Sequence, residues 1–175
     1  MKKTVRYVAV GVAVLGVLAL GGIATADDDL EFESEPSGAQ EVTMTGGTAT
    51  DADGKVTADF DDELSKVRVR VSFEDLEGEP VAAHFHCARA GQNGPVAFGL
   101  VSPGPCEFDG RHIRCTLTNA DVVDATGNAC MGSIGRPVTN IAALAFAMKD
   151  GLIYFNLHTT EFGSGEIRGQ MLLDD

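Results

Sequence analysis

The sequence contains no tryptophan, and its 13 lysine and arginine residues are outnumbered two to one by 26 aspartates and glutamates. A nucleic-acid-binding surface needs clustered cations that displace counterions from phosphate groups. The formal net charge of −13 therefore excludes DNA and RNA as partners. At 175 residues the chain is also too short for two full domains and suits one domain with or without a tail.

Motifs for catalysis are also missing. No serine lies in a G-x-S-x-G elbow, and the sequence has no phosphate-binding loop and no dinucleotide fingerprint. The runs of acidic residues at 61–63 and 74–75 are expected to be solvated loop charges rather than a glycosidase pair. We therefore predict a protein that is not an enzyme.

The first 26 residues have the three zones of a secretory signal peptide. The zones are a basic start with Lys2, Lys3 and Arg6, an apolar run over residues 8–23, and the small-residue site Ala24-Thr25-Ala26. A retained membrane anchor is the alternative, but the apolar run is slightly short for a full span. We predict cleavage after Ala26 and an exported chain, periplasmic, extracellular or at the cell surface, with no membrane insertion after cleavage.

Residues 27–37 are acidic and are expected to form a flexible lead-in to a single domain over residues 38–175. Within that domain, short segments alternate apolar and polar residues between turn signals, most clearly at residues 66–73. Asp53-Gly54 is expected to be a hairpin turn, and short helices are expected at 119–124 and 141–148. The pattern predicts an all-β fold, an immunoglobulin-like or Greek-key β-sandwich or barrel with one or two short helices.

Four cysteines lie in the predicted mature chain, and an even count in an oxidising compartment indicates two disulfides. Residues 106–115 are typical of a hairpin around Asp109-Gly110, in which a four-residue loop places the flanking cysteines opposite each other and a two-residue loop makes them diagonal. The predicted disulfides are Cys106–Cys115 and, by elimination, Cys87–Cys130. A zinc or copper thiolate site is the alternative, although the spacings lack a C-x-x-C pair.

His84 and His86 flank Phe85 in a predicted strand, so both imidazoles emerge from the same face. His158 lies near the end of another predicted strand. If the two strands are adjacent, the three histidines supply three nitrogen ligands with an open fourth position, which suits copper or zinc. His112, beside Arg111, is expected to be exposed.

The alternative for the three histidines is a polar network without a metal. In that network His84 or His86 donates to a backbone carbonyl or to Glu166, and Arg168 pairs with Glu41 or another carboxylate. We assign Glu166 and Arg168 to structural ion pairing that fixes the terminal strand. Convergence of the three imidazole nitrogens on one point, at about 2 Å, distinguishes a metal centre from this network.

Four separated motifs carry a resemblance to a known family. They are A-H-F-H at 83–86, G-Q-N-G-P-V at 91–96, Y-F-N-L-H-T-T at 154–160 and G-E-I-R-G-Q at 165–170. In this order they resemble the chordin-type CHRD domain family across residues 38–173. The resemblance implies an immunoglobulin-like β-barrel found in secreted bacterial proteins and no established catalytic activity, and the growth-factor binding of chordin is not carried over to a single domain.

The H-x-H pair is also similar to copper, zinc superoxide dismutase. The two-metal site of that family needs about six histidines and an aspartate, and this chain has 4 histidines. A working dismutase is therefore not expected, while a mononuclear site remains consistent with the count. As partner we expect an unidentified protein or cell-surface ligand, contacted through the loops at 87–95 and 125–138.

Overall fold

The computed structural model describes residues 30–174, and the predicted signal peptide lies outside them. One sheet contains β1 (Glu31–Ser34), β2 (Asp53–Phe60), β3 (Lys66–Glu74), β6 (Phe108–Asp109), β7 (His112–Thr118) and β10 (Leu172–Leu173). The other contains β4 (Pro80–Cys87), β5 (Val96–Val101), β8 (Ile153–Thr159) and β9 (Ile167–Gln170). The helical elements are η1 (Gly38–Gln40), η2 (Asn119–Asp121), α1 (Asn128–Ile134) and α2 (Ile141–Lys149).

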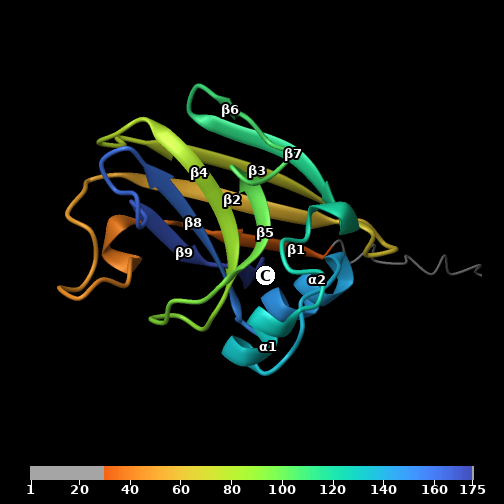
Figure 1. Ribbon diagram of the computed structural model, residues 1–175. Helices are drawn as coiled ribbons and strands as arrows, with labels where there is room; N and C mark the ends of the chain where they lie inside the picture. Colours follow the sequence, from red (N-terminus) through yellow and green to blue (C-terminus); the bar gives the residue numbers. More distant parts are fainter. Residues whose placement is uncertain (1–29, 175) are drawn as a thin grey trace, which may run out of the picture.

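The two sheets lie face to face as two layers, with both α-helices at one end (Figure 1). Strand order is β10-β1-β2-β3-β7-β6 in the first sheet and β5-β4-β8-β9 in the second, and all named strand pairs are antiparallel. The predicted all-β sandwich is therefore confirmed.

The core lies between the sheets and follows from the period-two pattern of the strands. Along β3, every second side chain from Val67 to Phe73 is buried and the intervening ones are exposed, as the sequence predicts. On the opposite sheet, the Phe85 and Phe155 rings are fully buried with their centroids 6.3 Å apart. This packing turns the residues on either side of Phe85 to the outer face of the four-stranded sheet.

The acidic segment before residue 38 differs from the prediction. Residues Glu31–Ser34 form β1, which pairs with both β2 and β10. The Phe32 ring is fully buried and meets the Phe60 ring edge-on at a centroid distance of 5.6 Å. The domain therefore begins before Gly38, and the predicted flexible lead-in is wrong for these residues because Phe32 completes the core.

The predicted turn at Asp53-Gly54 is also wrong, because these residues are the start of β2. A Cβ atom on Gly54 would lie 2.6 Å from the carbonyl oxygen of Ser72 on the neighbouring strand. The glycine is therefore needed for the close approach of two strands.

The structure forms both of the predicted disulfides, Cys87–Cys130 and Cys106–Cys115. In the second, Phe108 faces Ile113 and Asp109 faces His112, so the two-residue turn is Gly110-Arg111, one residue later than predicted. A two-residue turn at this later position does not make the cysteines diagonal. Continuing this register places the two cysteines opposite each other. The first disulfide joins the end of β4 to α1, and the Ser133 hydroxyl on α1 donates to the Cys87 carbonyl at 2.6 Å.

The helices partly match the predictions. The helix expected at 141–148 is α2, and the Asn140 side chain caps it by accepting a hydrogen bond from the Ala143 amide at 2.8 Å. One side of α2 faces solvent, where Phe146 is 54% exposed. The predicted helix at 119–124 is the shorter η2, and the predicted loop at 125–138 contains α1. No helix within residues 30–174 is long and apolar enough to cross a membrane.

Candidate metal centre

The three predicted histidines meet on the outer face of the four-stranded sheet. β4 and β8 are adjacent and antiparallel, and their register places His84 opposite Asn156, and His158 opposite Ala82. His84 and His86 are nearly buried, with 8% and 9% exposure, and His158 is half-buried. The adjacency that the sequence left open is therefore present.

Each imidazole is fixed by a backbone carbonyl. Nδ1 of His86 lies 2.9 Å from the Gly94 oxygen, Nδ1 of His158 lies 3.1 Å from the Gly163 oxygen, and Nε2 of His84 lies 3.3 Å from the Ser102 oxygen. Because a carbonyl oxygen only accepts, the ring nitrogen that contacts it must carry the N–H of the neutral imidazole. We call this the outer nitrogen of each ring and the other the inner nitrogen. The inner nitrogens, Nδ1 of His84 and Nε2 of His86 and His158, then carry bare lone pairs.

The inner nitrogens face one another. Nδ1 of His84 and Nε2 of His158 are 3.3 Å apart, and one nitrogen from each of the three histidines lies within 4.8 Å of the others. Nε2 of His86 is buried and has no hydrogen-bond partner among the described residues. Bare lone pairs that converge in a buried place are unfavourable unless a cation or proton lies between them.

Two further side chains, Tyr154 and Arg168, form a stack with the His86 ring. The Tyr154 ring lies parallel to the His86 ring, with centroids 4.8 Å apart and planes 7° apart. The Arg168 guanidinium carbon lies 3.5 Å from the centroid of the Tyr154 ring, a cation–π contact. The Tyr154 hydroxyl accepts from the Gly94 amide at 3.3 Å, so the Gly94 peptide contacts both His86 and Tyr154.

The structure corrects the predicted ion pairing of Glu166 and Arg168. Arg168 donates to the Asn93 side chain and to the carbonyls of Arg89 and Gln92, and forms no salt bridge within residues 30–174. Glu166 accepts hydrogen bonds from other groups, which are the hydroxyls of Thr50 and Thr159 and the amide of Glu77. The register of β9 with β8 explains this difference, because Arg168 lies opposite Asn156 and reaches the loop after β4.

Sequence reasoning did not assign Tyr154 or Asn156 to the site. The signal was present, because residues 154, 156 and 158 alternate along one strand and share a face. Asn156 donates a short hydrogen bond to Glu41, which approaches from the segment after η1. His112, which was predicted to be exposed, is half-buried in the β6–β7 hairpin, and it is not part of the cluster.

Burial decides the charge state of the cluster. It lowers the pKa of His86 to about 4, and it also lowers the pKa values of His84 and His158. The rings are therefore neutral at pH 7, the form in which imidazole binds metals. Burial raises the pKa of Glu41 to about 7, against the opposing effect of Arg168.

We expect Glu41→Gln to change the pH dependence of stability. The pKa of Glu41 rises from 4.5 to about 7 on folding, so its ionisation costs stability as the pH rises through this range. As the pH rises from 4.5 to 7, the free energy of unfolding of the variant should therefore increase by about 3 kcal/mol relative to that of the wild type. His86 has the opposite sign, since its lowered pKa removes stability as the pH falls from 6.5 to about 4.

Urea denaturation at several pH values, in EDTA, measures this difference. Glu35→Gln is the matched control, because Glu35 is exposed and its removal should leave the pH profile unchanged. Parallel profiles for Glu41→Gln and the wild type would show that Glu41 is not desolvated in the folded state.

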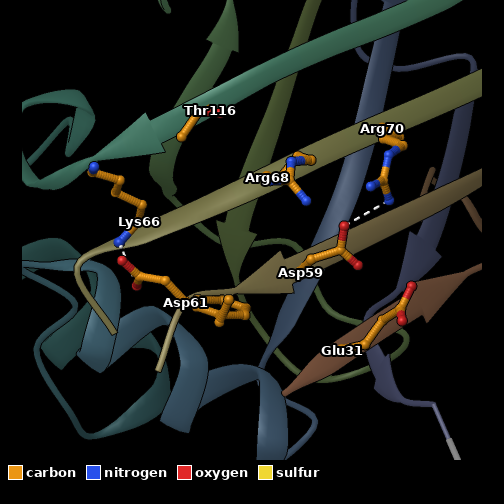
Figure 2. Close-up of a pocket in the computed structure, with 8 residues that line it drawn as sticks. Glu31, Asp59, Asp61, Lys66, Arg68, Arg70 and Thr116 are labelled. Atoms are coloured by element: carbon orange, nitrogen blue, oxygen red, sulfur yellow. Dashed lines mark hydrogen bonds and ion pairs between the residues drawn. The ribbon is translucent and has the colours of Figure 1, made fainter. Parts of the chain in front are cut away.

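A hollow of about 590 Å³ lies elsewhere, on the outer face of the six-stranded sheet (Figure 2). Figure 2 shows side chains of both charges along its walls, with Arg70 directed at Asp59. The Arg70 Nη1 to Asp59 Oδ2 distance is 2.6 Å, and the Asp61 carboxylate accepts from the Lys66 amide at 2.9 Å. This hollow is therefore a sheet surface whose charges are partly paired, and it contains none of the three histidines.

The fold and the outer-face cluster define a single-domain β-sandwich with three histidines that converge on adjacent strands. A family model described as CHRD domain matches residues 32–171. The chain therefore belongs to the CHRD domain family, and the predicted resemblance is confirmed. No similar curated protein and no similar solved structure was found.

Proposed function

We propose that this CHRD-domain protein is exported and has a non-catalytic binding role, in which His84, His86 and His158 hold one copper or zinc ion. The observation that carries the proposal is the direction of the rings. All three outer nitrogens contact backbone carbonyls, which leaves three inner nitrogens to face a common point. Histidines that bind metals are oriented in this way by partners on their other nitrogen.

The spacing of the nitrogens fits a metal ion of this kind. Two ligands about 2.0–2.1 Å from a tetrahedral metal ion are about 3.3 Å apart. Nδ1 of His84 and Nε2 of His158 already have this separation of 3.3 Å. Since the third nitrogen lies within 4.8 Å of both, it must approach by at most about 1.5 Å.

The donor set supports copper or zinc over calcium or magnesium. Imidazole nitrogen suits copper and zinc, whereas calcium and magnesium need oxygen ligands. No carboxylate joins the three histidines among the described residues. A three-histidine centre leaves a fourth position to water or to a partner's side chain. His112 starts β7 in the six-stranded sheet and is not part of the cluster.

The exported location rests on three features of the chain. The first 26 residues match a signal peptide, the cysteines are paired in two disulfides, and acidic residues exceed basic ones by 13. Disulfides persist in oxidising compartments, and the charge excess keeps an extracellular domain soluble. The same charge excess argues against nucleic acid and anionic membranes as partners.

Metal titration of the mature chain, expressed without a histidine tag, tests the proposal. We expect one Cu(II) or Zn(II) per chain by mass spectrometry of metal content. At metal concentrations about 1,000 times Kd, the free energy of unfolding should rise by about 4 kcal/mol. His86→Ala and His158→Ala should both lose the ion and this stabilisation.

His112→Ala is the matched control, because it removes a histidine outside the cluster and should retain full metal content. Two variants are used so that one folded protein remains if the nearly buried His86 is needed for folding. The polar network without a metal would be correct if the wild type binds neither Cu(II) nor Zn(II) and the variants are only less stable.

A further inference from the structure

A second polar site lies behind the stacked rings. His86 and Arg168 both stack on Tyr154, and since two planar groups cannot share one face of a ring, they lie on opposite faces. On the Arg168 side is a cavity of about 420 Å³. Its walls come from β9, the segment after η1 and the loop after β4, and they include Glu41, Val42, Ala90, Arg168 and Gln170.

The two loops that form the cavity are joined to each other and to β9. The Asn93 side chain donates to the Val42 carbonyl at 2.9 Å and accepts from Arg168 at 3.1 Å. Both segments lie beside β9, at the edge of the four-stranded sheet (Figure 1). The cavity is therefore built from segments that are held in place by side-chain hydrogen bonds.

The cavity brings together two buried ionisable groups of opposite charge that no salt bridge joins, in the part of the chain that the structure describes. Arg168 is 2% exposed and Glu41 is 8% exposed. Neither forms a salt bridge within residues 30–174, although each lies close enough to affect the pKa of the other. Burying a charge without a close counterion is costly, so a ligand with an anionic group for Arg168 and a cationic group for Glu41 would stabilise this arrangement.

The hydrogen-bonding capacity of the lining is also only partly used. Arg168 donates to three neutral oxygens, whereas a guanidinium has five N–H groups. The Glu41 carboxylate accepts from the neutral amide of Asn156. Oε1 of Gln170 is buried and has no partner in the described part of the chain.

From this geometry we propose that the cavity binds a small zwitterion, such as a dipeptide, with its carboxylate on Arg168 and its ammonium group on Glu41. Arginine is suited to carboxylates because its planar N–H groups match their oxygens. The remaining lining residues carry no charge, with Val42, Ala90 and Gly91 among them, so a ligand with small uncharged side chains between its two charged ends suits the cavity. This site does not depend on the proposed metal, because no histidine lines the cavity.

Calorimetric titration of the mature chain with L-alanyl-L-alanine tests the proposal. The experiment is run at pH 7.5, where Glu41, with a pKa of about 7, and the α-ammonium group of the dipeptide, with a pKa of about 8, are both mostly charged. Two blocked probes separate the charges, because N-acetyl-alanyl-alanine lacks the ammonium group and alanyl-alanine amide lacks the carboxylate. Each blocked probe should bind at least about tenfold more weakly, since a hydrogen bond to a charged group is lost.

Glu41→Gln keeps the shape of the side chain and removes its charge, so it should weaken the zwitterion by at least about tenfold. The Glu41→Gln variant should bind alanyl-alanine amide no more tightly than it binds the unblocked dipeptide. Glu35→Gln, an exposed acid outside this cavity, should leave all affinities unchanged. The proposal is overturned if the wild type does not bind the dipeptide at millimolar concentration, or if either blocked probe binds as tightly.

Discussion

Replacing Glu166 with glutamine is expected to lower the free energy of unfolding by about 4 kcal/mol. The carboxylate is fully buried and accepts from the Thr50 hydroxyl at 2.9 Å, the Glu77 amide at 2.7 Å and the Thr159 hydroxyl at 2.6 Å. A glutamine amide turns two N–H groups toward these donors, so at least one donor loses its acceptor in a dry environment. The loss of a negative charge also weakens the hydrogen bonds that remain.

This effect should extend to the histidine cluster. Glu166 joins β9 to the end of β8 through Thr159, and the loop between these strands provides the carbonyl of Gly163, which holds His158. Loosening that loop should weaken metal binding by about 10- to 100-fold, the usual cost of losing a group that orients a ligand. Arg168, two residues on, stacks on the ring that supports His86.

Urea denaturation of the apoprotein measures the stability loss. Glu161→Gln is the matched control, because Glu161 is an exposed carboxylate in the same loop and should change stability by less than about 0.5 kcal/mol. If Glu166→Gln and Glu161→Gln gave equal losses, Glu166 would not be the structural centre that its three hydrogen bonds indicate.

The parts of this fold that the sequence predicts are those set by local alternation. β3 is a regular case, because each apolar residue between Val67 and Phe73 faces the core and each polar one faces solvent. The three-histidine cluster was predicted for the same reason, since His84 and His86 are two residues apart in a strand. Only the adjacency of His158 needed the three-dimensional structure.

The parts that sequence reasoning missed depend on pairing between distant strands. β1 is acidic and has one large apolar side chain, and it becomes a strand because β2 and β10 supply its hydrogen bonds from either side. Gly54 has the character of a turn residue, yet it allows close strand approach. The predicted pairing of Arg168 with Glu41 or another carboxylate was wrong because the strand register places Arg168 opposite Asn156, and its guanidinium lies over the Tyr154 ring.

Removal of the Cys87–Cys130 disulfide is expected to have an effect of similar size. The two cysteines are 43 residues apart, and the loss of this constraint on the unfolded chain corresponds to about 4 kcal/mol. Cys87 directly follows His86 at the end of β4, so the disulfide also fixes the strand end that carries one proposed ligand. The double variant Cys87→Ser/Cys130→Ser should therefore be less stable and also bind metal more weakly, by about 10-fold or more.

The second disulfide provides a control within the same molecule. Cys106 and Cys115 are 9 residues apart, so Cys106→Ser/Cys115→Ser should cost only about 2.5 kcal/mol. Cys115 belongs to β7 in the six-stranded sheet, and the three histidines lie on the four-stranded sheet, so this variant should keep the wild-type metal affinity. Urea denaturation and metal titration of both variants separate the two effects. A general loss of stability would lower the metal affinity of both variants. A role of the disulfide in positioning His86 would lower the metal affinity only of the variant without the Cys87–Cys130 disulfide.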